Sequence, residues 1–168
     1  MPRFFPAILC LLLAACSKSE PQLDPRSLET DAGEAVLRKL FADCPPKARA
    51  AKSACLVLGP SQMEASAEFQ NRLANLGPRL LPHKDVTITG LSGKVRVHEK
   101  PQGNEAVSLV LLLQITEITG TPPNQKAVAA WAFKDSMMRR SYSIRSDRGT
   151  LTVSPGDIIE QKSGEAEK

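Results

Sequence analysis

The chain has few side chains that could do chemistry, and its cysteines and histidines come first. Cys44 and Cys55 do not have the Cys-x-x-Cys spacing of thioredoxin-like redox motifs. His83 and His98 are scattered and do not supply the ligand spacing of known structural zinc sites. Cys44 and Cys55 are an even pair, so we predict that they form a structural disulfide, with no metal ion and no cofactor. A metal site that these cysteines share with the two histidines is the alternative.

Candidate catalytic groups are equally sparse. Ser61 follows a Gly-Pro turn, but Ser61-Gln-Met-Glu64 has the pattern of a capping box, which explains this serine without a nucleophilic role. His98 alternates to the same side as an arginine and is expected to face water. Three carboxylates could form an acid–base pair only if the fold brought them together: Glu99, Glu105 and Asp135. The chain has no phosphate-binding loop and no His-Glu-x-x-His motif, so no catalytic residue is predicted.

Residues 1–15 have the composition of a secretory leader. One early cation, Arg3, precedes an apolar run that is too short to span a bilayer and ends in small residues. The tetrapeptide Leu13-Ala14-Ala15-Cys16 resembles the lipobox of bacterial lipoproteins. This resemblance implies that a diacylglycerol group is attached to the Cys16 thiol, that the leader is cleaved after Ala15, and that palmitate-like chains hold the product in a membrane.

The segment after Cys16 is expected to act as a tether. Residues 16–31 are mostly polar and include two prolines, so they cannot bury enough apolar surface to fold. A flexible segment of this length reaches roughly 20 Å. Ser17 stands where an aspartate would retain a Gram-negative lipoprotein in the inner membrane, so the resemblance implies an outer-membrane location facing the periplasm.

Basic residues gather in two stretches, which we consider as contacts for anionic lipid head groups: Lys47, Arg49 and Lys52, and Arg139, Arg140, Arg145 and Arg148. Each cation near such a surface contributes about 1 kcal/mol. The alternative is that both stretches are ordinary solvated faces. A formal charge of +4 on 168 residues is too small to indicate nucleic-acid binding.

Hydrophobic periodicity predicts the elements of one domain over residues 32–154. Helical spacing covers 31–43 and a second stretch that follows Ser61, and a short apolar run at 55–58 predicts a buried strand. The period then changes to two, which predicts strands at 86–89, 95–98, 106–118, 126–133, 139–145 and 150–153. The strand at 106–118 is apolar on both faces, as in a covered central strand. Residues 155–168 are expected to be a flexible tail.

These elements predict an α+β domain, in which two N-terminal helices pack on one face of a mostly antiparallel sheet of four to six strands. The leading hypothesis for function is a non-enzymatic, membrane-anchored module that binds an envelope protein or glycan. One alternative is a hydrolase or isomerase with His98 or carboxylates in a pocket between sheet and helices. Another is a carrier of a lipophilic ligand.

Overall fold

The computed structural model describes residues 24–91, 94–101 and 108–163. The expected leader, the lipidation site Cys16 and residues 16–23 of the expected tether lie outside this part of the chain. The prediction that the tether does not fold is wrong for its second half, because Pro25–Leu28 form a 3-10 helix and Leu28 is buried in the core. None of the described helices combines the length and the apolar composition that crossing a membrane requires. The helical elements are η1 (Pro25–Leu28), α1 (Asp31–Asp43), α2 (Pro46–Arg49), α3 (Ala67–Arg72), η2 (Ala74–Leu76) and η3 (His83–Asp85). The strands are β1 (Ser53–Leu58), β2 (Met63–Glu64), β3 (Arg79–Leu81), β4 (Val86–Leu91), β5 (Lys94–Glu99), β6 (Val110–Thr121), β7 (Asn124–Phe133), β8 (Ser136–Asp147) and β9 (Thr150–Lys162).

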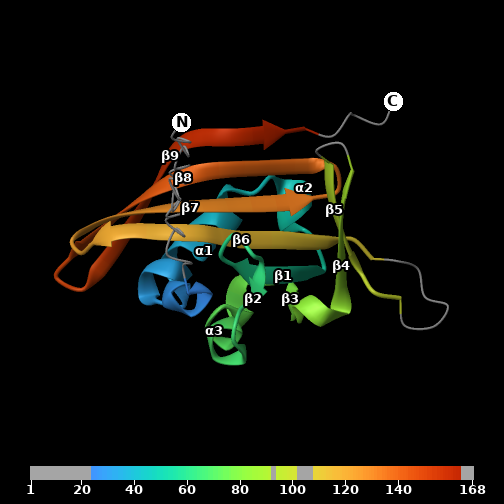
Figure 1. Ribbon diagram of the computed structural model, residues 1–168, viewed down its shortest axis with the longest axis horizontal. Helices are drawn as coiled ribbons and strands as arrows, with labels where there is room; N and C mark the ends of the chain where they lie inside the picture. The colour runs from blue at the N-terminus through green and yellow to red at the C-terminus, as the bar shows by residue number, and fades with distance from the viewer. Residues whose placement is uncertain (1–23, 92–93, 102–107, 164–168) are drawn as a thin grey trace, which may run out of the picture.

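A mixed sheet of seven strands dominates the molecule (Figure 1). Its order is β2-β1-β6-β7-β8-β9, and β3 also pairs with β1. Strand β1 is parallel to β6 and β3, whereas β6, β7, β8 and β9 form an antiparallel meander. Strands β4 and β5 form a separate two-stranded hairpin.

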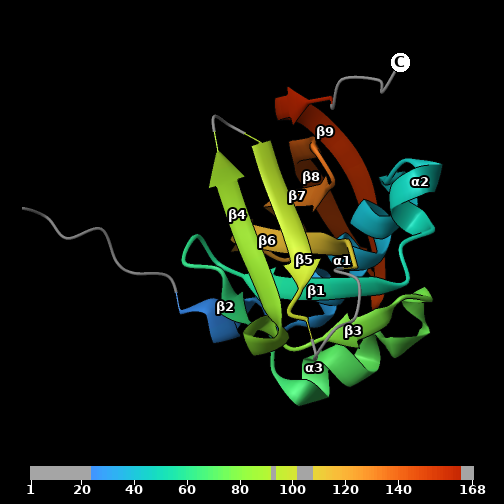
Figure 2. The ribbon, with the colours of Figure 1, turned by 90° about the vertical axis from the view of Figure 1, so that its right-hand side faces the viewer.

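The two faces of the large sheet have different covers. Helix α1 lies against β6, β7, β8 and β9 on one face, and the β4–β5 hairpin crosses the other (Figure 2). Because side chains alternate along a strand, β6 contributes Leu111, Leu113 and Ile115 to the helix-side core. The same strand contributes Val110 and Leu112 to a smaller hairpin-side core. This confirms the prediction that β6 is apolar on both faces.

Helix α1 has the limits that its periodicity predicts. Its N-cap is Thr30, whose side chain accepts a hydrogen bond from the Gly33 amide, and not Asp31. Glu34 is therefore free for ion pairs. Its carboxylate binds Arg38 at 2.8 Å and Arg72 of α3 at 2.6 Å, so charged groups join α3 to α1.

The predicted fold class is wrong. Most of the structure is strand, the sheet is mixed and has seven strands, and the second predicted helix is only the six-residue α3. This helix lies at the β1 side of the sheet, away from β6 to β9 (Figure 1). It starts later than predicted because residues 63–64 pair with β1 as a strand. Ser66 caps α3 instead of Ser61, through a 3.2 Å bond from the Phe69 amide to its hydroxyl.

The predicted tail is also wrong over its first eight residues. Strand β9 continues to Lys162 and forms an edge of the sheet. Pro155 can lie in this strand because an edge strand leaves one row of amides without partners in the sheet. Register shifts near Arg140 accommodate the irregular stretch around Gly156.

Candidate cleft on the hairpin side of the sheet

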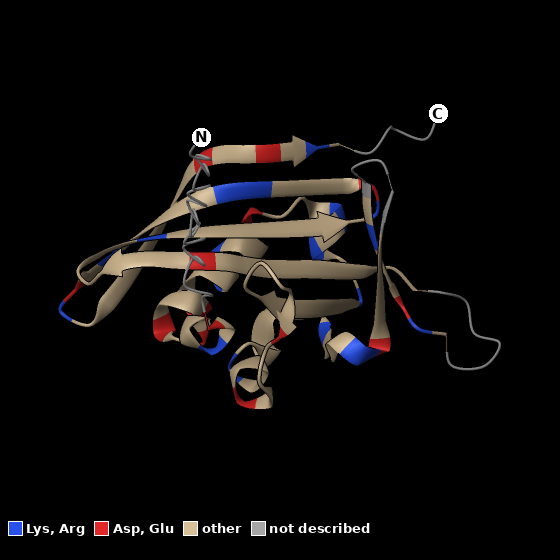
Figure 3. Cartoon of the chain, viewed as in Figure 1, with Lys and Arg blue, Asp and Glu red and all other residues tan. Residues whose placement is uncertain are grey.

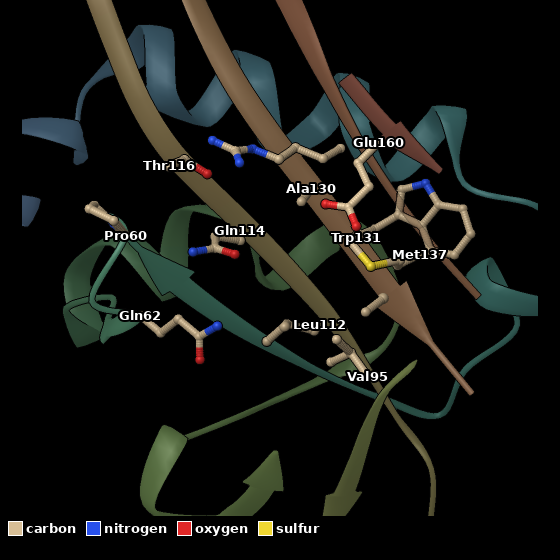
Figure 4. A pocket seen from close by; sticks show the side chains of 12 residues that line it. Pro60, Gln62, Val95, Leu112, Gln114, Thr116, Ala130, Trp131, Met137 and Glu160 are labelled. Atoms are coloured by element: carbon tan, nitrogen blue, oxygen red, sulfur yellow. The ribbon is translucent and has the colours of Figure 1, made fainter. Parts of the chain in front are cut away.

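A cleft of about 310 Å³ opens on the sheet face that the hairpin covers only in part (Figure 4). It lies beside the hairpin-side core and takes side chains from the β1–β2 turn and from strands β5 to β9. Its polar lining consists of Gln62, Gln114, Thr116, Arg139 and Glu160, and its apolar lining consists of Pro60, Val95, Leu112, Ala130, Trp131, Ala132 and Met137.

The floor of the cleft is a row of residues across four neighbouring strands. Gln114 is opposite Ala130, Ala130 is opposite Arg139, and Arg139 is opposite Glu160. Directly opposite residues share a face and are nearest neighbours. The methyl group of Ala130 stands between two long polar side chains and leaves space above β7. Ala132 is the next residue on the same face of β7 and extends this space.

One wall is the turn between β1 and β2. Gly59 and Gln62 both have left-handed backbone conformations, with φ of 71° and 55°. Such a conformation is uncommon for a glutamine and is often found at functional sites. The turn is held onto the sheet because Nε2 of Gln114 donates to the Gly59 carbonyl oxygen at 2.8 Å. Gln62 and Gln114 thus lie on the same side of the cleft (Figure 4).

Arg139 contributes to the cleft a buried hydrogen-bond donor that no described residue satisfies. Its Nε is buried and has no hydrogen-bond partner among the described residues. Its cross-strand neighbour Glu160 instead pairs with Lys162 at 2.9 Å. A buried donor without a partner is costly, so a ligand that offers an acceptor there would recover this free energy.

The opposite wall is the hairpin, which an ion pair attaches to the sheet. Nε and Nη2 of Arg96 in β5 donate to the two carboxylate oxygens of Asp135, at 2.6 and 2.7 Å. Asp135 lies in the turn between β7 and β8, where Lys134 has a φ of 57°. This bidentate geometry fixes orientation as well as distance, so the pair holds β5 in position against the β7–β8 turn.

The cleft combines groups that suit recognition. Amides and a hydroxyl donate and accept hydrogen bonds without changing protonation, and a guanidinium stays charged at every physiological pH. The apolar side chains beside them offer contact for the less polar parts of a ligand.

The predicted disulfide is wrong, since Cys44 and Cys55 are both free. Cys44 follows the last residue of α1 and lies in the helix-side core, whereas Cys55 of β1 lies in the hairpin-side core. The sheet separates the two thiols. Burial raises the pKa of each to about 12.

The structure does not bring the candidate catalytic groups together. Asp135 and Glu99 bind different arginines, Arg96 and Arg79, and Glu105 lies outside the described residues. The prediction that His98 faces water is wrong for one ring nitrogen, because Nδ1 is buried and has no hydrogen-bond partner in the described part of the chain. Within the described ranges, no three metal-binding side chains gather to form a metal site.

The two predicted basic stretches lie on several parts of the surface (Figure 3). Lys47 and Arg49 belong to α2, and Lys52 lies just before β1. Of the four arginines, Arg139 lines the cleft and Arg140 donates to the Gly156 carbonyl at 2.9 Å, while Arg145 and Arg148 lie near the β8–β9 turn. The lipid contacts of these residues stay a prediction.

The sequence reasoning missed the neutral residues of the cleft, Gln62, Gln114 and Thr116. A signal was present in β7, where alanines recur from 127 to 132 and mark a strand with little bulk. Glutamine 114 also interrupts the apolar run of β6. Comparisons of the chain with protein-family models, with curated proteins and with solved structures found no match.

Proposed function

We propose that this protein is a lipid-anchored binding module of the bacterial envelope, which holds an envelope protein or glycan in the cleft on the hairpin side of its sheet. Residues 13–16 support the anchor, since they resemble a lipobox. The observation that carries the binding role is the buried Nε of Arg139, which has no partner among the described residues in a cleft of hydrogen-bonding groups.

The anchor is tested by replacing the sulfur atom. Cys16→Ser removes the acyl acceptor, so this variant should leave the membrane fraction, and fatty acid should be found by mass spectrometry only on the native chain. A variant that stays in the membrane fraction, together with a native protein free of fatty acid, would contradict the anchor.

The binding role is tested with the full chain carrying Cys16→Ser, so that lipid does not contribute to binding. It is sedimented with isolated peptidoglycan and, separately, with detergent-free envelope fragments. Adding Arg139→Ala should weaken binding to at least one of them about tenfold, because a charge-assisted hydrogen bond is lost. Arg145→Ala is the matched control, since Arg145 is exposed and is not among the cleft residues. Equal binding by both variants would exclude the cleft.

A further inference from the structure

A second cavity, of about 410 Å³, lies on the opposite face of the sheet from the cleft. We call it the α2 cavity, because it lies between α2 and the ends of β7 and β8. Its lining comprises Pro45, Pro46, Lys47, Ala48, Trp131, Phe133, Lys134 and Ser136. Its volume is within the range of small-molecule sites, about 300–1,000 Å³.

The lining is apolar apart from a few polar groups. Two proline rings and two aromatic rings line the cavity, and Ala48 of α2 is 2 % exposed. Pro46 is the first residue of α2, where its missing amide hydrogen costs nothing, so the rigid Pro-Pro pair both starts the helix and forms a wall. A chain of methylene groups is the natural complement of such walls.

Cations flank this apolar surface. Lys47 and Lys134 are exposed, and no ion pair of either is found among the described residues. Trp131 is 6 % exposed, and its Nε1 has no hydrogen-bond partner in the same part of the chain. Trp131 lines the cleft as well as the α2 cavity and is the one residue that the two linings share.

We propose that the α2 cavity binds a long-chain fatty acid. The acyl chain lies against the proline, tryptophan and phenylalanine rings, and the carboxylate pairs with Lys47 and Lys134. Charge complementarity selects this occupant, since an uncharged chain would leave both ammonium groups unused. The inference concerns a second site and does not depend on the cleft.

The test exploits Trp131, the single tryptophan of the 168-residue chain. A bromine atom quenches tryptophan fluorescence on contact, so quenching by dibromostearic acid reports an acyl chain bound next to Trp131. Because Trp131 also lines the cleft, the substitutions described below separate binding in the α2 cavity from binding in the cleft. The full chain with Cys16→Ser is titrated below the concentration at which the fatty acid aggregates. Saturable quenching is expected. The double variant Lys47→Glu, Lys134→Glu should bind about tenfold more weakly.

A matched double variant makes the same charge change elsewhere. Arg49→Glu with Lys126→Glu alters two other exposed cations that do not line the α2 cavity, and it should bind like the parent. Circular dichroism melting verifies that all variants are folded. Absence of saturable quenching would overturn the proposal, as would equal loss in both double variants.

Ligand controls test the class of ligand. Dibromostearyl alcohol should bind at least about tenfold more weakly than the acid, and equal binding would overturn the role of the carboxylate. Stronger quenching by a brominated lysophosphatidic acid or by an acidic proline-rich peptide carrying bromophenylalanine would assign the cavity to another occupant and refute the fatty acid. Arg139→Ala in the cleft should leave quenching unchanged, so failure here is distinguishable from failure of the proposed function.

Discussion

The two faces of the large sheet are built from the same strands, yet one is filled and the other is left partly open. On the helix side, α1 lies along four strands, and its Val36, Leu37 and Leu40 are fully buried. On the hairpin side, β4 and β5 cross the strands and cover only one end of them (Figure 2). At the end of the region that the hairpin covers, the cleft-facing residues of β6 change from apolar Leu112 to polar Gln114, the next residue on the same face. Because α1 lies along four strands whereas the hairpin crosses them, the hairpin face of the sheet is the one that has room for a ligand.

The reactivity of the two buried thiols compares how well α1 and the hairpin protect the sheet faces that they cover, since Cys44 lies on the helix side and Cys55 on the hairpin side. Because burial raises the pKa of Cys44 and Cys55 to about 12, from 9.0, each should have a thiolate fraction roughly a thousandfold below that of an exposed thiol. Both should therefore resist Ellman's reagent at pH 8 in the folded protein and react after unfolding. Cys55, under the smaller hairpin cover, should react before Cys44. Two thiols that remain unreactive in non-reducing denaturant would indicate a disulfide and contradict the separation by the sheet.

A second comparison replaces Leu112 or Leu113 by alanine, two adjacent residues of β6 whose side chains lie on opposite faces of the sheet. Leu113 is 0 % exposed in the helix-side core, whereas Leu112 borders the cleft at 5 % exposure. Leu113→Ala should lower the free energy of unfolding by about 2–5 kcal/mol, because the closed core retains the cavity. Leu112→Ala should cost about 1 kcal/mol less, since its vacated space joins the cleft. Urea denaturation measures both values, and equal losses would mean that the cleft side is packed as tightly as the helix side.

Much of this comparison could be anticipated from local patterns, and the rest could not. The limits of α1 and the double apolar pattern of β6 follow from periodicity, which depends only on neighbours in the chain. The length of β9 does not, because Pro155 and Gly156 indicate a break in any local reading. Gly156 leaves room for Ser141 of β8, whose Oγ would lie 2.4 Å from an added Cβ and would have to rotate away.

The residues of the cleft also could not be predicted from local patterns in the sequence. Arg139 was predicted as a surface cation, but pairing in register across β7, β8 and β9 places it in the floor of the cleft beside Ala130. The disulfide prediction rested on an even count of cysteines, which carries no information about the face of the sheet. Ser61 had the local features of a cap, but the carboxylate of Glu29 accepts from the amide and the hydroxyl of Ser66 and fixes the start of α3 there.

The helix side also depends on carboxylates that hold α3 against α1. Burial raises the pKa of Glu34, but hydrogen bonds from Arg38 and Arg72 outweigh this effect and lower the pKa below 4.5. A depressed pKa in the folded state stabilises the fold above the unfolded-state value, and this contribution is lost as the pH falls through the lower value. Glu34→Gln should cost about 1 kcal/mol at pH 7 and much less below the folded-state pKa. Thermal melts across this range measure it, and a cost independent of pH would contradict the ionic role.

On the hairpin side, an ion pair of partly exposed groups joins β5 to the β7–β8 turn. Arg96→Ala removes the link to Asp135 and should cost about 0.5–1 kcal/mol, which corresponds to about two- to fivefold faster local opening. Amide hydrogen exchange should accelerate in β4 and β5 while β7 and β8 are unchanged. Arg79→Ala, which removes the pair with Glu99 at the other end of β5, is the control for loss of any hairpin ion pair. Faster exchange throughout the sheet would contradict the view that the hairpin is a separate cover.

Photocrosslinking in living cells is the most direct test of whether the cleft on the hairpin side of the sheet binds a partner. A photoreactive phenylalanine analogue is placed at Gln62 in the cleft wall or at Lys126 on β7 away from the cleft, in otherwise native protein. We predict a defined crosslinked species from position 62, which disappears with Arg139→Ala and does not form from position 126. Crosslinks that are the same from both positions, or that persist without Arg139, would contradict a binding site on the hairpin side of the sheet.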